Sequence, residues 1–136
     1  MAMYGLGARY ETDVTDVFVQ NELACVGWNY EDAPSLHEIM RSVQVGDIIY
    51  LKSHPPSIGL IIKAIGLVRN SEVFRSDHGA ACVRVEWLWQ GPAVTIGHVQ
   101  DRYNVRNNTL YEEWNPDVRT RILNLLLGRE QGAASE

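Results

Sequence analysis

Short apolar runs separated by turn residues fill the first two-thirds of the chain, and they predict strands rather than long helices. Residues 14–20 and 23–28 are rich in β-branched and other apolar side chains and predict one or two short strands. Residues 47–52 and 58–68 form two further apolar runs, separated by a loop whose adjacent prolines cannot continue a ladder. The longer run contains two glycines, which we expect at bends or bulges of a sheet that curls toward a barrel.

Residues 80–89 show the alternation that is typical of a strand with one buried face. One set of alternate positions is uniformly apolar and is expected to point inward; it comprises Ala81, Val83, Val85, Trp87 and Trp89. Gly91 and Pro92 end this run, and residues 93–97 predict one more short strand.

Two segments have the spacing of amphipathic helices. Residues 36–43 carry apolar side chains at helical intervals, and Ser35 with Glu38 fits a capping box at the start of this helix. Residues 116–127 predict the second helix, with Asn115 as its N-cap and a glycine just after its end.

These elements predict an α+β fold: a small, bent, mostly antiparallel sheet or barrel with flanking helices. The length of 136 residues suits one hydrophobic core, so we expect a single domain over residues 1–128 and a disordered polar tail over residues 129–136. No apolar run approaches the roughly 20 residues of a membrane span, and no signal-peptide core is found at the N-terminus, so no membrane contact is expected. Cys25 and Cys82 share no CxxC spacing and are expected to be reduced, buried thiols of a cytoplasmic protein.

The charge distribution bears on nucleic-acid binding. The net charge of −5 argues against a protein that coats nucleic acid with a generally basic surface. Residues 51–110, however, hold seven basic and four acidic side chains, most of the basic ones arginine, which suits phosphate contacts. The candidate phosphate-binding residues are Arg69, Arg75, Arg84, Arg102 and Arg106.

Little in the sequence indicates catalysis or metal binding. The four histidines lie at positions 37, 54, 78 and 98, and none has the close spacing to another ligand that a zinc site requires. The sequence contains no nucleophile elbow, phosphate-binding loop or dinucleotide fingerprint. We therefore expect a protein without catalytic activity, metal or cofactor.

Aromatic residues are the more informative candidates for a binding site. Trp28 and Tyr30 lie in a polar, loop-like segment, where aromatic side chains either pack locally or line a cleft. Trp87 and Trp89 share one face of a strand, and either pack in the core or close a pocket. Stacking a base on such a ring contributes roughly 1–3 kcal/mol and needs little sequence specificity.

Five short features are spread over roughly residues 23–90: Gly27-Trp28, the capped helix, VGDIIYLK at residues 45–52, IKAIGLV at residues 62–68, and VRVEW at residues 83–87 as a later strand. Together they resemble the PUA-like superfamily, and within it the EVE and YTH-like domains. The similar domains include the DNA-reading domains of McrB-type restriction systems. Such domains are curved β-barrels with flanking helices that bind nucleic acid, and several hold a modified, flipped base in an aromatic-lined pocket.

The resemblance implies a base pocket in this chain. Trp28 matches the tryptophan that borders the pocket, Tyr30 would share that wall, and Lys52 and Ser53 would form the floor. Trp87 or Trp89 would close the cage from the later strand. The expected function is a nucleic-acid-binding domain without catalytic activity; a small-molecule or nucleotide-binding module and a protein–protein interaction domain are the alternatives. The sequence leaves open DNA or RNA, the base modification and the oligomeric state.

Overall fold

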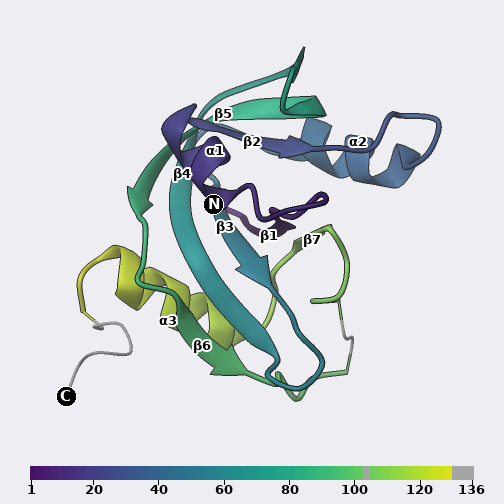
Figure 1. Cartoon of the computed structure of the whole chain (residues 1–136). Coiled ribbons are helices and arrows are strands. Elements are labelled where there is room, and N and C mark those ends of the chain that lie inside the picture. The colour runs from purple at the N-terminus through teal and green to yellow at the C-terminus, as the bar shows by residue number, and fades with distance from the viewer. Residues whose placement is uncertain (103–104, 130–136) are drawn as a thin grey trace.

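One seven-stranded sheet carries the structure, a computed structural model that describes residues 1–102 and 105–129 (Figure 1). The strands are β1 Met3–Gly7, β2 Leu23–Val26, β3 Ile48–Ser53, β4 Leu60–Ser76, β5 Gly79–Trp89, β6 Val94–Gly97 and β7 Leu110–Glu112. The helices are α1 Thr15–Gln20, α2 Pro34–Ser42 and α3 Pro116–Leu126. Most of the tail predicted to be disordered, residues 130–136, lies outside the described residues.

The sheet is mostly antiparallel, as predicted. Its strand order is β2-β5-β4-β3-β1-β7, and β6 pairs with the N-terminal end of β4 at residues 60–62. Among the described strands, only β1 and β3 pair in parallel. The sheet is open, with β2 and β7 at the ends of the strand order, so closure into a barrel stays a prediction.

The long strand β4 bends where the sequence places a glycine. Its ladder with β5 shifts register between Ile65 and Gly66, as expected for a bulge. A Cβ on Gly66 would lie 2.7 Å from the backbone oxygen of Glu86, so only glycine lets the strands approach this closely. Gly59, just before β4, has φ +91° and lies against the backbone of Gly97.

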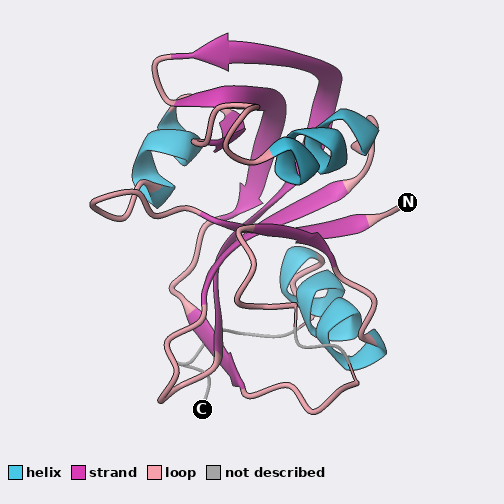
Figure 2. Cartoon of the chain, turned by 90° about the vertical axis from the view of Figure 1, so that its right-hand side faces the viewer, coloured by secondary structure: helices cyan, strands magenta, loops and turns pink. Residues whose placement is uncertain are grey.

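Two hydrophobic cores lie on opposite faces of the sheet. Alternate residues of β3 serve different cores: Ile49 and Leu51 pack with α1 and α2, whereas Ile48 and Tyr50 pack with α3. A strand that is buried on both faces has a continuous apolar run, which explains the pattern of residues 48–51. Figure 2 shows α1 and α2 around the upper part of the sheet and α3 around the lower part.

The prediction of a strand over residues 14–20 is wrong, because this segment forms α1. Val14 and Phe18 lie four residues apart, on one side of the helix; Phe18 is fully buried in the core beside α2, and Val14 packs against that core. Burial of this face outweighs the weak preference of β-branched residues for strands. Strands β1 and β7 were not predicted from the sequence.

The other helices agree with their predictions to within two residues at each end. α3 begins after Asn115, whose side chain accepts hydrogen bonds from the backbone N–H groups of Asp117 and Val118. In α2 the expected capping box is absent: Ala33 occupies the N-cap position without a side-chain hydrogen bond. None of the helices described is both long enough and apolar enough to span a membrane.

The expectation of two reduced cysteines is wrong. Cys25 of β2 and Cys82 of β5 lie directly opposite each other in the antiparallel ladder and form a disulfide. The two residues are 57 positions apart, so sequence spacing gave no sign of the pairing. Both are buried, next to the hairpin that joins β4 to β5.

Candidate functional site

A cleft of about 620 Å³ opens where four segments of the chain meet. These segments are the loop after β1, the end of β2, the hairpin between β4 and β5, and the loop before β7. Lys52 contributes from the end of β3. The larger side chains among the residues that line the cleft are Arg9, Tyr10, Glu11, Trp28, Lys52, Arg75, Asp77, His78 and Asn107.

Two aromatic side chains, Trp28 and Tyr10, line this cleft and remain accessible to a ligand. Trp28 is 56% exposed and Tyr10 is 43% exposed. The imidazole Nε2 of His37 donates a hydrogen bond to the backbone oxygen of Trp28 at 2.6 Å, which fixes the backbone beneath the indole. Exposed rings on a fixed backbone are suited to stacking against a planar ligand.

Tyr10 is held from three sides. Its hydroxyl donates to the backbone oxygen of His78 at 2.6 Å, and its ring packs edge-to-face on Phe18. A Cβ on Gly27 would lie 2.8 Å from the ring, so glycine is required for this contact. Burial raises the pKa of Tyr10 to about 12, so its hydroxyl remains protonated at neutral pH.

Lys52 is the one buried residue among those that line the cleft, and it forms the cleft floor. Its Nζ donates to the backbone oxygens of Arg106 at 2.7 Å and Asn108 at 2.8 Å. It also lies 5.4 Å from the centre of the Tyr111 ring. Burial lowers the pKa of Lys52 to about 8, and no carboxylate of the described residues forms an ion pair with it.

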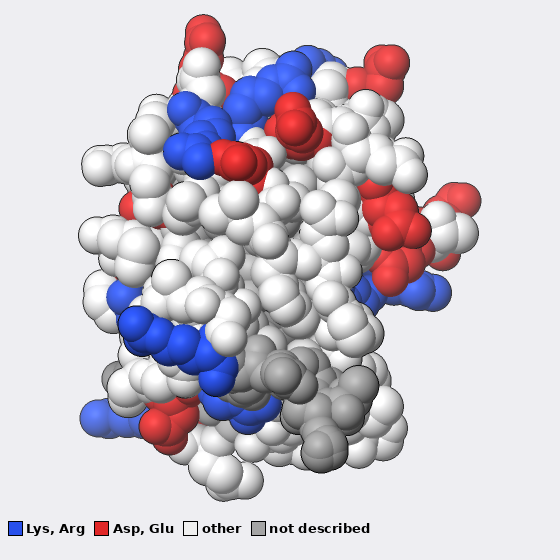
Figure 3. Space-filling view, turned by 90° about the vertical axis from the view of Figure 1, so that its left-hand side faces the viewer, with Lys and Arg blue, Asp and Glu red and all other residues white. Residues whose placement is uncertain are grey.

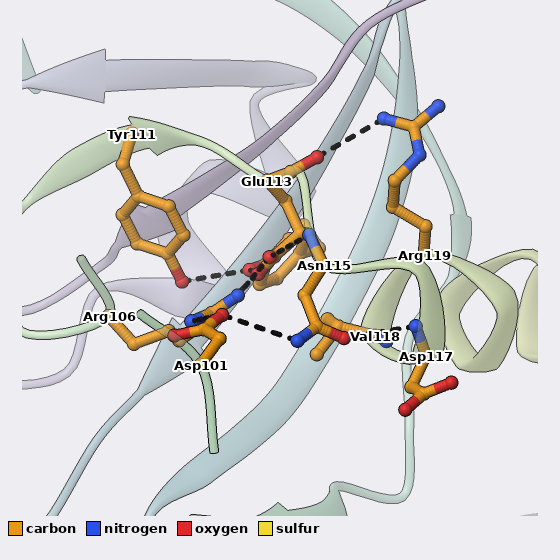
Figure 4. Close-up of polar contacts among 9 residues, drawn as sticks. Asp101, Arg106, Tyr111, Glu113, Asn115, Asp117, Val118 and Arg119 are labelled. Atoms are coloured by element: carbon orange, nitrogen blue, oxygen red, sulfur yellow. Dashed lines mark hydrogen bonds and ion pairs between the residues drawn. The ribbon is translucent and has the colours of Figure 1, made fainter. Parts of the chain in front are cut away.

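A buried network holds the loop that supplies these carbonyl groups (Figure 4). The Arg106 guanidinium pairs with Asp101 at 2.6 Å and with the fully buried Glu113. Glu113 also accepts a hydrogen bond from Tyr50 at 2.6 Å. The side chain of Arg106 therefore anchors the loop, while its backbone oxygen holds Lys52.

The structure brings together three of the residues predicted to bind a ligand: Trp28, Lys52 and Arg75. Arg75 lines the cleft from the end of β4, where its guanidinium donates to the Asn29 side chain at 3.2 Å. Ser53 follows Lys52 but does not line the cleft.

The other three aromatic candidates lie elsewhere. Tyr30 packs edge-to-face on His37, outside the cleft. Trp87 is buried, and its Nε1 donates to the backbone oxygens of Phe18 and Leu23 at 3.1 and 3.3 Å. Trp89 packs against the core beside α3. Of the two interpretations left open for Trp87 and Trp89, the structure matches core packing.

The other four arginines predicted to bind phosphate do not line the cleft. Arg69 pairs with Glu86, and Arg84 donates to the backbone oxygen of Asn21. Arg102 borders a separate hollow, and Arg106 is 1% exposed. Figure 3 shows basic and acidic side chains side by side at the upper end of one face, rather than one continuous basic surface.

Arg9 and Tyr10 were not predicted from the sequence, because β1, the strand that precedes them, was not recognised. The signal was present, since Tyr10 lies in the polar run Arg9–Asp13, the same kind of setting that drew attention to Trp28. Arg9, Lys52 and Arg75 bring three cationic groups to the cleft against the carboxylates of Glu11 and Asp77.

No model of a known protein family matches this chain, and no curated protein is significantly similar to it in sequence. The comparisons therefore add nothing to the resemblance to the PUA-like superfamily.

Proposed function

We propose that the chain is a nucleic-acid-binding domain without catalytic activity and that its cleft holds a single base. The base is flipped out of a duplex or presented by a single strand. The observation that carries this proposal is the presence of exposed Trp28 and Tyr10 in one cleft with Arg9, Lys52 and Arg75. The mostly antiparallel α+β fold agrees with the proposed membership of the PUA-like superfamily.

The size and energetics of the cleft suit one nucleotide. Its volume of about 620 Å³ lies within the range of clefts that bind small ligands, roughly 300–1,000 Å³. Stacking contributes roughly 1–3 kcal/mol per base, and unstacking a base costs a few kcal/mol. Stacking on Trp28 or Tyr10 together with polar contacts to Lys52 therefore offsets most of the cost of flipping.

A free nucleotide is the second candidate ligand. It is favoured by the placement of the arginines, because among the five arginines predicted to contact phosphate only Arg75 lines the cleft. The two candidates differ in salt dependence. Contacts of Arg9 and Arg75 with two phosphates of a single strand give a slope of about −1.4 in a plot of log K against log salt. A free nucleotide with one phosphate gives a shallower slope.

The decisive experiment compares Trp28→Ala with Trp114→Ala. Both indoles are exposed, Trp28 at 56% and Trp114 at 73%, but Trp114 does not line the cleft. Binding is measured by fluorescence anisotropy with a labelled single-stranded oligonucleotide and with a duplex that contains a central mismatch. We expect Trp28→Ala to weaken binding by about tenfold or more, since it removes one stacking partner. Trp114→Ala should leave binding unchanged.

Thermal unfolding supplies the control for both variants. An exposed ring leaves no cavity when it is removed, so each variant should keep its stability within about 1 kcal/mol of the wild type. Equal binding by the wild type and Trp28→Ala would contradict the proposal. The proposal would also fail if the wild type bound neither of the two oligonucleotides.

A further inference from the structure

The position of Lys52 suggests which bases the cleft accepts. Lys52 is 6% exposed, whereas Trp28 and Tyr10 are 56% and 43% exposed, so a base that enters past these rings meets the ammonium group last. An ammonium group has three N–H donors and no acceptor. Within residues 1–102 and 105–129, two of these donors bond to the backbone oxygens of Arg106 and Asn108, which leaves the third for a ligand.

This third donor is unusual because it belongs to a desolvated cation. A buried charge is costly unless hydrogen-bond acceptors surround it, and no carboxylate in the described part of the chain pairs with Lys52. The nearest aromatic ring, that of Tyr111, offers only its π face at 5.4 Å. A ligand that presents an oxygen acceptor to Nζ therefore gains a charge-assisted hydrogen bond.

The geometry of a nucleotide determines which atom reaches the floor. The sugar remains at the cleft mouth, because it continues into the strand. The deepest position is then the one farthest from the glycosidic bond, namely C4 of a pyrimidine and the C6 side of a purine. Uracil, thymine and guanine carry a keto oxygen there, whereas cytosine and adenine carry an amino group.

We propose that Lys52 makes the cleft selective for keto bases over amino bases. This inference rests on the proposed function, since it requires that the cleft holds a base. A keto oxygen accepts the free N–H of Lys52. An amino group presents an N–H donor to the N–H donor of Lys52, so no hydrogen bond forms and the third N–H of the buried ammonium group stays unsatisfied.

The test compares ligands that differ at this position. Oligonucleotides of six dU or six dC residues form the first pair, and a single hypoxanthine or adenine between abasic residues forms the second. Each ligand is titrated with the wild type, with Lys52→Met and with Lys63→Met as the matched control. Lys63 is the only other lysine of the chain; it pairs with Asp13 and does not line the cleft.

We expect the wild type and Lys63→Met to bind the keto member of each pair about tenfold more tightly, as for one hydrogen bond to a charged group. Lys52→Met should bind both members of a pair equally. Equal binding by the wild type, a preference for the amino base, or a preference that persists in Lys52→Met would overturn the inference.

Three outcomes need separate interpretation. If Lys52→Met does not fold, the wild type alone decides: a keto preference in both pairs supports the inference, and a preference in one pair only overturns it. If the wild type binds none of the four ligands, the proposed function fails together with the inference. Binding of all four with equal affinity leaves the proposed function intact and removes only the inference.

Discussion

Replacement of Trp87 tests whether this indole belongs to the core rather than to a binding site. Trp87 is 7% exposed, and its Nε1 bridges the backbone oxygens of Phe18 in α1 and Leu23 in β2. Trp87→Ala should cost about 3–5 kcal/mol from the lost packing and the cavity. The two carbonyl groups that lose their donor add about 1 kcal/mol or more. The total is a large share of the roughly 5–15 kcal/mol that stabilises a typical domain.

Trp87→Phe keeps a six-membered ring in the core and removes the donor together with the pyrrole part of the indole, so its loss of stability should be smaller than that of Trp87→Ala. We expect a loss of about 1–3 kcal/mol for this variant. Urea unfolding followed by circular dichroism gives the free energies without relying on tryptophan fluorescence. The matched control is Trp28→Ala, which should lose no more than about 1 kcal/mol. Losses of equal size for Trp87→Ala and Trp28→Ala would refute the assignment of one indole to the core and the other to the cleft.

Three further predictions concern groups that line or support the cleft. Removal of the disulfide in a Cys25→Ala, Cys82→Ala double variant should lower the free energy of unfolding by about 4 kcal/mol, the chain-entropy value for a loop of 57 residues; an unchanged urea midpoint would contradict this. Glu113→Gln leaves the buried Arg106 without its closest carboxylate and should cost about 3 kcal/mol in the same assay, and a loss under 1 kcal/mol would show that the ion pair is dispensable. The pKa of Lys52 is about 8 in the folded state, compared with 10.5 for an unperturbed lysine. Between pH 8 and pH 10.5 the unfolded chain therefore binds more protons than the folded chain. The contribution of Lys52 to the free energy of unfolding consequently rises with pH. From pH 7 to pH 10 the stability of the wild type relative to Lys52→Met should therefore increase by about 2 kcal/mol, and a pH-independent difference would contradict the assigned pKa.

The parts of the fold that could be predicted from sequence are those in which local pattern and burial agree. β3 and β5 have strong apolar patterns, and α3 begins with an N-cap that the structure confirms. For residues 14–20 the local pattern and burial disagree: their β-branched composition favours a strand, whereas burial of Phe18 favours the observed helix. β1 could not be recognised, because its short sequence MYGLG contains two glycines and becomes a strand through its parallel pairing with β3.

The candidate site was predicted only in part, because its residues come from segments that are distant in sequence. Trp28 was identified from its polar, loop-like setting and from the resemblance to a family. Lys52 was identified through that resemblance alone, and Arg75 through the excess of basic residues in the middle of the chain. Arg106 illustrates the limit of charge counting. Its guanidinium group is 1% exposed and pairs with Glu113, so it anchors the loop of the cleft floor and is not presented at the surface.

The cleft is built from loops, yet covalent and ionic contacts fix two of its sides. The wall formed by the β4–β5 hairpin lies against the disulfide, since a Cβ on Gly79 would lie 2.5 Å from the Cβ of Cys25. The floor depends on Arg106, whose side chain is held by Glu113 while its backbone oxygen receives the Lys52 hydrogen bond at 2.7 Å. A site that is ordered before the ligand arrives loses less conformational entropy on binding. We therefore expect that removal of the disulfide or of the Arg106–Glu113 pair weakens binding of the proposed ligand as well as stability.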